Sequence, residues 1–159
     1  MLGETWKADS YHLRYTGRMS TLHAELGRLC AAHDVLALYL FGSRADEGLA
    51  LLEGRHVPAE SSDLDIGVVF RTPDLDHHRL ASLQVALEDH FAPLRIDLVP
   101  LQRVDALFQF AAIDGHRVAT SDSTAADLYE LEVMRRGAEL LPLERQLQAQ
   151  ITEQTKQRS

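Results

Sequence analysis

The spacing of apolar residues predicts a helix near the start of the chain and a buried strand directly after it. The helical stripe is formed by Leu22, Leu26, Leu29 and Cys30. It indicates a helix that begins after a capping serine, Ser20, and ends near His33. Residues 35–41, VLALYLF, are apolar without interruption, which is typical of a central strand that is buried on both faces.

Two later segments alternate between apolar and polar residues, as strands with one buried face do. In residues 64–70, LDIGVVF, one face carries Leu64, Ile66, Val68 and Phe70. In residues 95–101, RIDLVPL, Ile96 and Leu98 lie opposite Asp97. Because the apolar faces must pack against helices, we expect Asp63, Asp65 and Asp97 to share the opposite face.

The remaining segments are predicted to be helices around one more short strand. Thr72 is a suitable N-cap with Pro73 at the first helical position, ahead of an apolar helical face that ends at Phe91. Another helix covers about 104–113 and closes at Asp114-Gly115. A strand is expected over 116–120 and a helix over 124–136, with Gly137 as its end.

These elements predict an α/β domain with a small sheet. We expect an irregular segment over residues 1–19, one folded domain over 20–137 and a C-terminal helical segment over 138–159. The last segment carries an apolar stripe of Leu143, Leu147 and Ile151. In the first segment, Trp6, Tyr11 and Tyr15 are candidates for packing or partner contacts.

Composition narrows the class of protein. A chain of 159 residues with 45% apolar residues has room for one compact core. The net charge of −8 and the pI near 5.4 argue against direct nucleic-acid binding, because no basic stripe exists to neutralise phosphates. Because Cys30 is the single cysteine of the sequence, an internal disulfide is impossible. No stretch has the length of a signal peptide or a membrane span, so we expect a soluble cytoplasmic protein.

The three aspartates are the first candidates for chemistry. Clustered carboxylates repel one another unless cations compensate their charge. Mg²⁺ prefers carboxylate oxygens together with water and substrate phosphates, and the Asp-x-Asp spacing of Asp63 and Asp65 places both side chains on one face of a strand. An aspartate that bridges two Mg²⁺ ions would allow metal-assisted phosphoryl transfer.

A Gly-Ser pair supplies the second half of the candidate site. Gly42-Ser43 ends the strand 35–41 and opens a helical turn, SRADEG. Backbone N–H groups at such a turn bind phosphate, and glycine allows the close approach of a ligand. If the strands 35–41 and 64–70 are antiparallel neighbours, Ser43 lies beside Asp63. Arg44 is explained equally well as a phosphate contact and as a solvated residue at a helix start. Adjacent His77 and His78 diverge on a helix and indicate a surface pair.

The combination GSRA…SSDLDIGVVF…RIDLV resembles the DNA polymerase β-type nucleotidyltransferase superfamily, and most closely its minimal nucleotidyltransferase (MNT) antitoxins. The resemblance covers roughly residues 20–125. It implies a nucleotidyltransferase fold with a mixed sheet packed against helices, and Mg²⁺-dependent use of ATP. It also implies Gly42 and Ser43 on the triphosphate, Asp63 and Asp65 on two Mg²⁺ ions, and Asp97 as third ligand and activator of the acceptor hydroxyl.

The same resemblance implies a partner and a reaction. MNT antitoxins pair with helical HEPN ribonuclease toxins and transfer AMP to a toxin tyrosine. In this chain, residues 44–62 separate Gly-Ser from Asp-x-Asp, a longer stretch than is usual in the family, and we expect it to lengthen the helix or to form a flap. Two alternatives stay open: an antitoxin that acts by binding alone, and nucleotide transfer to a small molecule such as an aminoglycoside.

Overall fold

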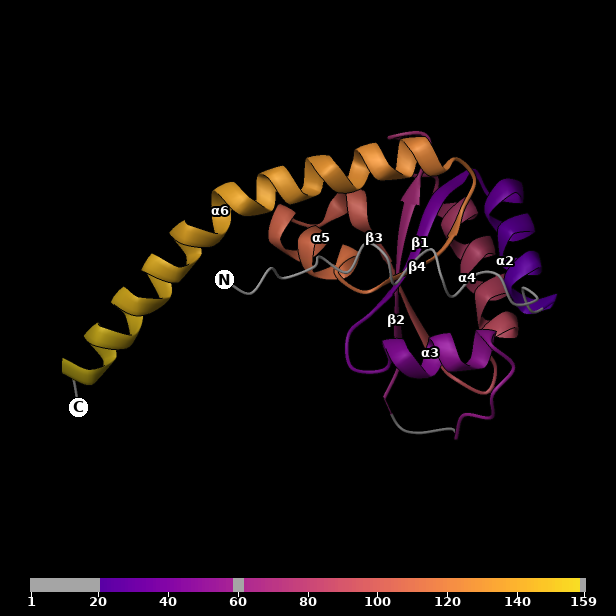
Figure 1. Ribbon diagram of the computed structural model, residues 1–159, viewed down its shortest axis with the longest axis horizontal. Helices are drawn as coiled ribbons and strands as arrows, with labels where there is room; N and C mark the ends of the chain where they lie inside the picture. The colour runs from indigo at the N-terminus through magenta and orange to yellow at the C-terminus, as the bar shows by residue number, and fades with distance from the viewer. Residues whose placement is uncertain (1–20, 59–61, 158–159) are drawn as a thin grey trace, which may run out of the picture.

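A computed structural model describes residues 21–58 and 62–157 (Figure 1). Ser20 and the aromatic residues of segment 1–19 lie outside this range. At its centre is a four-stranded sheet of order β3-β2-β1-β4. The strands are β1 (Val35–Phe41), β2 (Leu64–Phe70), β3 (Ile96–Pro100) and β4 (His116–Thr120). β1 is antiparallel to both β2 and β4, and β2 is parallel to β3. The prediction of an α/β domain with a small mixed sheet is confirmed.

Helices cover both faces of this sheet (Figure 1). They are α2 (Thr21–Ala32), α3 (Ala45–Leu52), α4 (His77–Phe91), the 3-10 helix η1 (Leu101–Arg103), α5 (Ala106–Ile113) and α6 (Ser123–Gln157). α2 and α4 pack side by side on one face, and α5 with the first part of α6 covers the other. No helix in the described parts of the chain has the length and apolarity of a membrane span.

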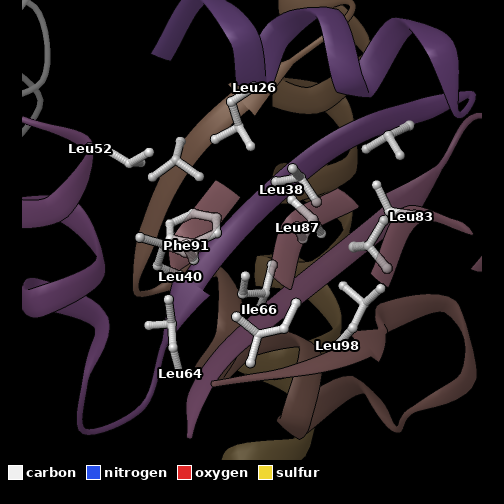
Figure 2. Close-up of a cluster of buried hydrophobic side chains, with 14 of the residues drawn as sticks. Leu26, Leu38, Leu40, Leu52, Leu64, Ile66, Leu83, Leu87, Phe91 and Leu98 are labelled. Atoms are coloured by element: carbon white, nitrogen blue, oxygen red, sulfur yellow. The ribbon is translucent and has the colours of Figure 1, made fainter. Parts of the chain in front are cut away.

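The face covered by α2 and α4, here called the closed face, holds the larger core (Figure 2). The even-numbered residues of β2 point into it, as the alternation predicts. The core includes Leu26, Leu38, Leu40, Leu64, Ile66, Val68, Leu83, Leu87, Phe91 and Leu98. Cys30 is buried in the same core, and burial raises the pKa of its thiol to about 12. The thiol therefore stays protonated and acts as a small apolar group.

The opposite face, here called the open face, holds a smaller core. Ala37, Tyr39, Val69, Leu101, Ala112 and Ala126 form it. Gly67 leaves space for Leu101 of η1, since a Cβ on this glycine would lie 3.0 Å from the leucine Cδ1. Asp65 belongs to the same alternating series as Gly67 and Val69, so its side chain is on the open face.

α4 does not begin where the sequence predicts. The prediction of Thr72 as N-cap is wrong: the helix starts at His77, and the Asp76 carboxylate accepts a hydrogen bond from the His78 N–H at 2.9 Å. The Thr72 hydroxyl is instead 3.1 Å from a carboxylate oxygen of Asp34. A tertiary contact thus occupies the side chain that local sequence marks as a cap.

The predicted end of the last helix at Gly137 is also wrong, because α6 continues to Gln157. Gly137 is buried, and a Cβ there would lie 2.7 Å from the Phe110 ring. It is therefore a packing glycine rather than a helix terminator. Beyond it, α6 extends away from the sheet (Figure 1). Its distal stripe is exposed, with Leu143 at 56%, Leu147 at 58% and Ile151 at 56%.

Candidate active site

The end of β1 and the start of β2 meet at one edge of the open face. Phe41, the last residue of β1, is paired with Asp65, and Gly42 follows with φ +75°. A Cβ added to Gly42 would overlap a carboxylate oxygen of Asp65. Glycine is therefore required here for two reasons, a left-handed backbone and the close approach of a carboxylate. The antiparallel pairing of β1 and β2, the condition under which the two motifs were expected to meet, is present.

β3 adds the next carboxylate to this edge. The parallel register pairs Asp65 with Asp97, so both side chains are on the open face. Partial burial raises the pKa of Asp65, and the neighbouring charges of Asp97 and then Asp63 raise it further. The Asp65 carboxylate thus lies within the electrostatic influence of the other two.

Asp63 has an additional partner that sequence reasoning misses. It stands directly before β2, and Arg95 stands directly before β3, where the two strand starts are joined by a hydrogen bond from the Leu64 N–H to the Arg95 carbonyl at 2.8 Å. Arg95 Nε lies 3.1 Å from Asp63 Oδ1. The signal was available, because a parallel pairing of these strands places the residues that precede them side by side.

The carboxylates are suitable ligands for Mg²⁺ but are not gathered as a ready coordination shell. Within residues 21–58 and 62–157, no group of three His, Cys, Asp or Glu side chains is arranged to hold a metal ion. Asp65 and Asp97 are neighbours on one face, whereas Asp63 contacts Arg95. The donor chemistry, oxygen atoms whose mutual repulsion a cation would relieve, fits a hard divalent ion.

Ser43 and Arg44 differ sharply in exposure. Ser43 is exposed between Gly42 and the start of α3. Arg44 is only 2% exposed, and its guanidinium donates hydrogen bonds to the carbonyls of Ser62 (2.9 Å) and Pro58 (3.2 Å). Arg44 therefore connects the start of α3 to the segment that leads into Asp63, and it is not a solvated residue. Its expected phosphate contact stays a prediction.

The long stretch between the two motifs is largely accommodated by structure. α3 occupies the first part of this stretch, from Ala45 to Leu52. The expectation that the stretch lengthens the helix or forms a flap stays a prediction. Leu52 and Val57 are buried in the core of the closed face. The insertion therefore leaves the end of β1 and the start of β2 in register, and the two halves of the candidate site stay together.

An aromatic pair borders the carboxylates. The ring of Phe41 meets the ring of Phe108 from α5 edge to face, with centroids 5.7 Å apart and an interplanar angle of 79°. Phe108 is 39% exposed, although it is a large apolar residue on a helix that packs against the sheet.

The sequence matches the family profile described as polymerase beta, nucleotidyltransferase, over residues 25–124. The chain therefore belongs to this family and is a nucleotidyltransferase. None of the curated protein sequences compared with the chain matches it.

Solved structures with the same fold include three toxin–antitoxin complexes. A mutant MntA–HpeT complex with two Asp-to-Glu substitutions is 15% identical, with a TM-score of 0.60, covering 82% of this chain and 98% of that chain. A tri-AMPylated Shewanella oneidensis HEPN toxin with MNT antitoxin is 14% identical, with a TM-score of 0.58, covering 85% of this chain and 99% of that chain. A toxin–antitoxin with AMP-PNP is 16% identical, with a TM-score of 0.58, covering 82% of this chain and 98% of that chain. At these identities, the similarity establishes the fold.

Proposed function

We propose that this nucleotidyltransferase is an antitoxin that transfers AMP from ATP to a tyrosine of a HEPN-type toxin, with Mg²⁺ at its carboxylates. The observation that carries the proposal is the contact of Gly42 with Asp65, beside Asp97. It joins a phosphate-binding turn to a pair of metal ligands. The similar structures support the choice of partner, since one is an AMPylated HEPN toxin with its MNT antitoxin.

The Gly42-Ser43 turn binds the triphosphate in this proposal. It lies at the N-terminus of the eight-residue helix α3, where unpaired N–H groups and the helix dipole favour an anion. The lack of a side chain at Gly42 lets phosphate oxygens approach the backbone, and the exposed Ser43 adds a hydroxyl donor. Arg44 has a positioning role in this proposal, because its guanidinium donates a hydrogen bond to the carbonyl of Ser62, the residue before Asp63.

Asp65 and Asp97 would hold the Mg²⁺ ions, and Asp63 would join them when its carboxylate leaves Arg95. Bound Mg²⁺ supplies neutralisation of the charge that develops on the phosphates. Partial burial, and then the charges of Asp97 and Asp63, raise the pKa of Asp65, and a bound cation would lower it. Arg95 is in this view a counter-ion for Asp63 before the metal binds.

The transfer step needs a nucleophile and a base. Asp97 accepts the proton of the tyrosine hydroxyl, whose oxygen then forms a bond to the α-phosphorus of ATP. The bond from this phosphorus to the bridging oxygen of the β-phosphate breaks, and pyrophosphate leaves. The exposure of Asp97 at the end of the sheet gives the side chain of a second protein access to it.

A second candidate function is neutralisation of the toxin by binding alone. The ion pair between Asp63 and Arg95 is the observation that favours it, because one of the expected ligands already has a cationic partner within the protein. The exposed stripe of α6 is consistent with both functions, since exposed apolar residues in a row mark protein-binding surfaces. Transfer to a small molecule has no comparable support from the described residues.

Intact-mass spectrometry of the toxin tests the proposal. The toxin would be co-expressed with wild-type protein, with Asp63→Ala/Asp65→Ala, and with Asp89→Ala as a control at an exposed aspartate on α4. We expect whole AMP units on the toxin with wild type and control, and none with the double variant. An unmodified toxin that still co-purifies with all three proteins would contradict AMP transfer and support the binding antitoxin.

A further inference from the structure

The row of side chains across the edge of the open face does not stop at the carboxylates. Asp97 on β3 is paired with Asp65 on β2, and Asp65 is paired with Phe41 on β1. Directly opposite residues of antiparallel strands have Cβ atoms about 5 Å apart and on the same face. Phe41 therefore lies beside Asp65, on the side away from Asp97, and it is directly followed by the Gly42-Ser43 turn.

Phe108 extends this aromatic surface toward solvent. Its backbone N–H donates a hydrogen bond to the side chain of Asp105, the N-cap of α5, at 2.8 Å, so the first turn of the helix is fixed. The ring contacts Phe41 in an edge-to-face arrangement, and 39% of the residue remains exposed. Phe108 therefore presents part of an aromatic side chain to solvent beside the Phe41 ring.

We infer that the Phe41–Phe108 pair stacks the base of the bound nucleoside triphosphate; this inference rests on the proposed nucleotide site. The proposed site places the triphosphate at Gly42-Ser43 and its α-phosphate at the carboxylates. The nucleoside must therefore lie at one of the two ends of this row of side chains, beside Asp97 or beside Phe41. In the proposed reaction, the acceptor hydroxyl occupies the side of Asp97. On the side of Phe41 an aromatic surface lies against the same turn that binds the phosphates.

The chemistry of the pair defines what it recognises. Stacking on an aromatic side chain strengthens binding of every base, because each base has a π-face. Two phenylalanines offer no hydrogen-bond donor or acceptor to distinguish adenine from guanine. The pair thus contributes affinity for the nucleoside part of the substrate and little discrimination among purines.

Calorimetry with two ligands tests this inference. Binding of ATP and of inorganic tripolyphosphate, each with Mg²⁺, would be measured for wild type, Phe108→Ala, Phe108→Tyr and a control, Val85→Ala, which alters an exposed apolar residue on α4. We expect Phe108→Ala to weaken ATP binding about 5–150-fold, the range for loss of one base–aromatic stack. Tripolyphosphate binding should stay unchanged, and Phe108→Tyr should retain ATP affinity.

The outcomes separate this inference from the proposed function. Equal weakening of both ligands in Phe108→Ala, or unchanged ATP affinity, would overturn base stacking. Unchanged ATP affinity with reduced AMP transfer would instead place the pair against the acceptor. Because the measurement reads binding, a wild-type protein that binds ATP but modifies no toxin contradicts only the proposed function. Thermal melting of Phe108→Ala checks that the variant is folded.

Discussion

The two faces of the sheet are built from the same strands but have different surroundings. On the closed face, Leu38, Ile66 and Val68 are fully buried under α2 and α4. On the open face, α5 and α6 cover only part of the strands, and the ends of β1, β2 and β3 carry Phe41, Asp65 and Asp97. Charged groups cannot be buried cheaply. Period-2 alternation lets one strand supply a core on one side and a site on the other.

The first prediction compares matched valines on the two faces. Val68 is fully buried on the closed face, whereas Val99 is half-buried on the open face. Val68→Ala should lower the free energy of unfolding by about 2–3 kcal/mol, since it removes two methyl groups from a filled core. Val99→Ala should cost about 1 kcal/mol. Chemical denaturation measures both, and equal losses would show that the open face is packed as tightly as the closed one.

The second prediction compares two glycines with nearly the same backbone. Gly42 has φ +75° and Gly54 has φ +78°, but only at Gly42 would a Cβ meet another group, the carboxylate of Asp65. Gly54→Ala should lower the free energy of unfolding by about 1 kcal/mol through left-handed strain alone. Gly42→Ala should cost about 2 kcal/mol.

Activity separates these two glycine variants further. Gly42→Ala displaces Asp65 and fills the space proposed for a phosphate, so AMP transfer should fall at least about 10-fold, as expected for misplaced reacting groups. Gly54→Ala should retain the wild-type rate. A Gly42→Ala protein with wild-type transfer would show that the Gly-Ser turn does not approach the nucleotide.

The strands could be predicted because they follow from local periodicity, whereas the meeting of the motifs also needed the assumption that β1 and β2 are antiparallel neighbours. The letters Asp-Leu-Asp occur twice in this chain, at 63–65 and at 74–76. Only the first pair enters an alternating strand and reaches the sheet edge. In the second, Asp76 caps α4. The Asp-Leu-Asp motif alone therefore does not define a site. Its position at the start of an alternating strand does.

Features that depend on tertiary contacts could not be predicted in this way. The burial of Arg44 depends on the carbonyls of Pro58 and Ser62, which lie 14 and 18 residues further along the chain. Gly137 has the appearance of a helix end until the Phe110 ring is placed against it. Long-range packing decides both, and no local propensity encodes it.

The smallest predicted effect concerns the cost of placing charge on the open face. The pKa of Asp65 is raised in the folded protein by partial burial and by Asp97 and Asp63. The folded state therefore binds a proton more tightly than the unfolded state at this group. Its contribution to stability is favourable at acidic pH and is lost as the pH rises through the raised pKa.

Asp65→Asn removes this charge and should abolish AMP transfer while slightly stabilising the metal-free fold. We expect a gain of up to about 1 kcal/mol at pH 7, discounted because the side chain is partly exposed and screened. The gain should shrink toward low pH, where wild-type Asp65 is protonated, and in high salt. Denaturation at several pH values measures it, with Asp89→Asn as control. A destabilised Asp65→Asn protein would mean that the carboxylate stabilises the fold. The open face would then contribute to stability as well as to the candidate site.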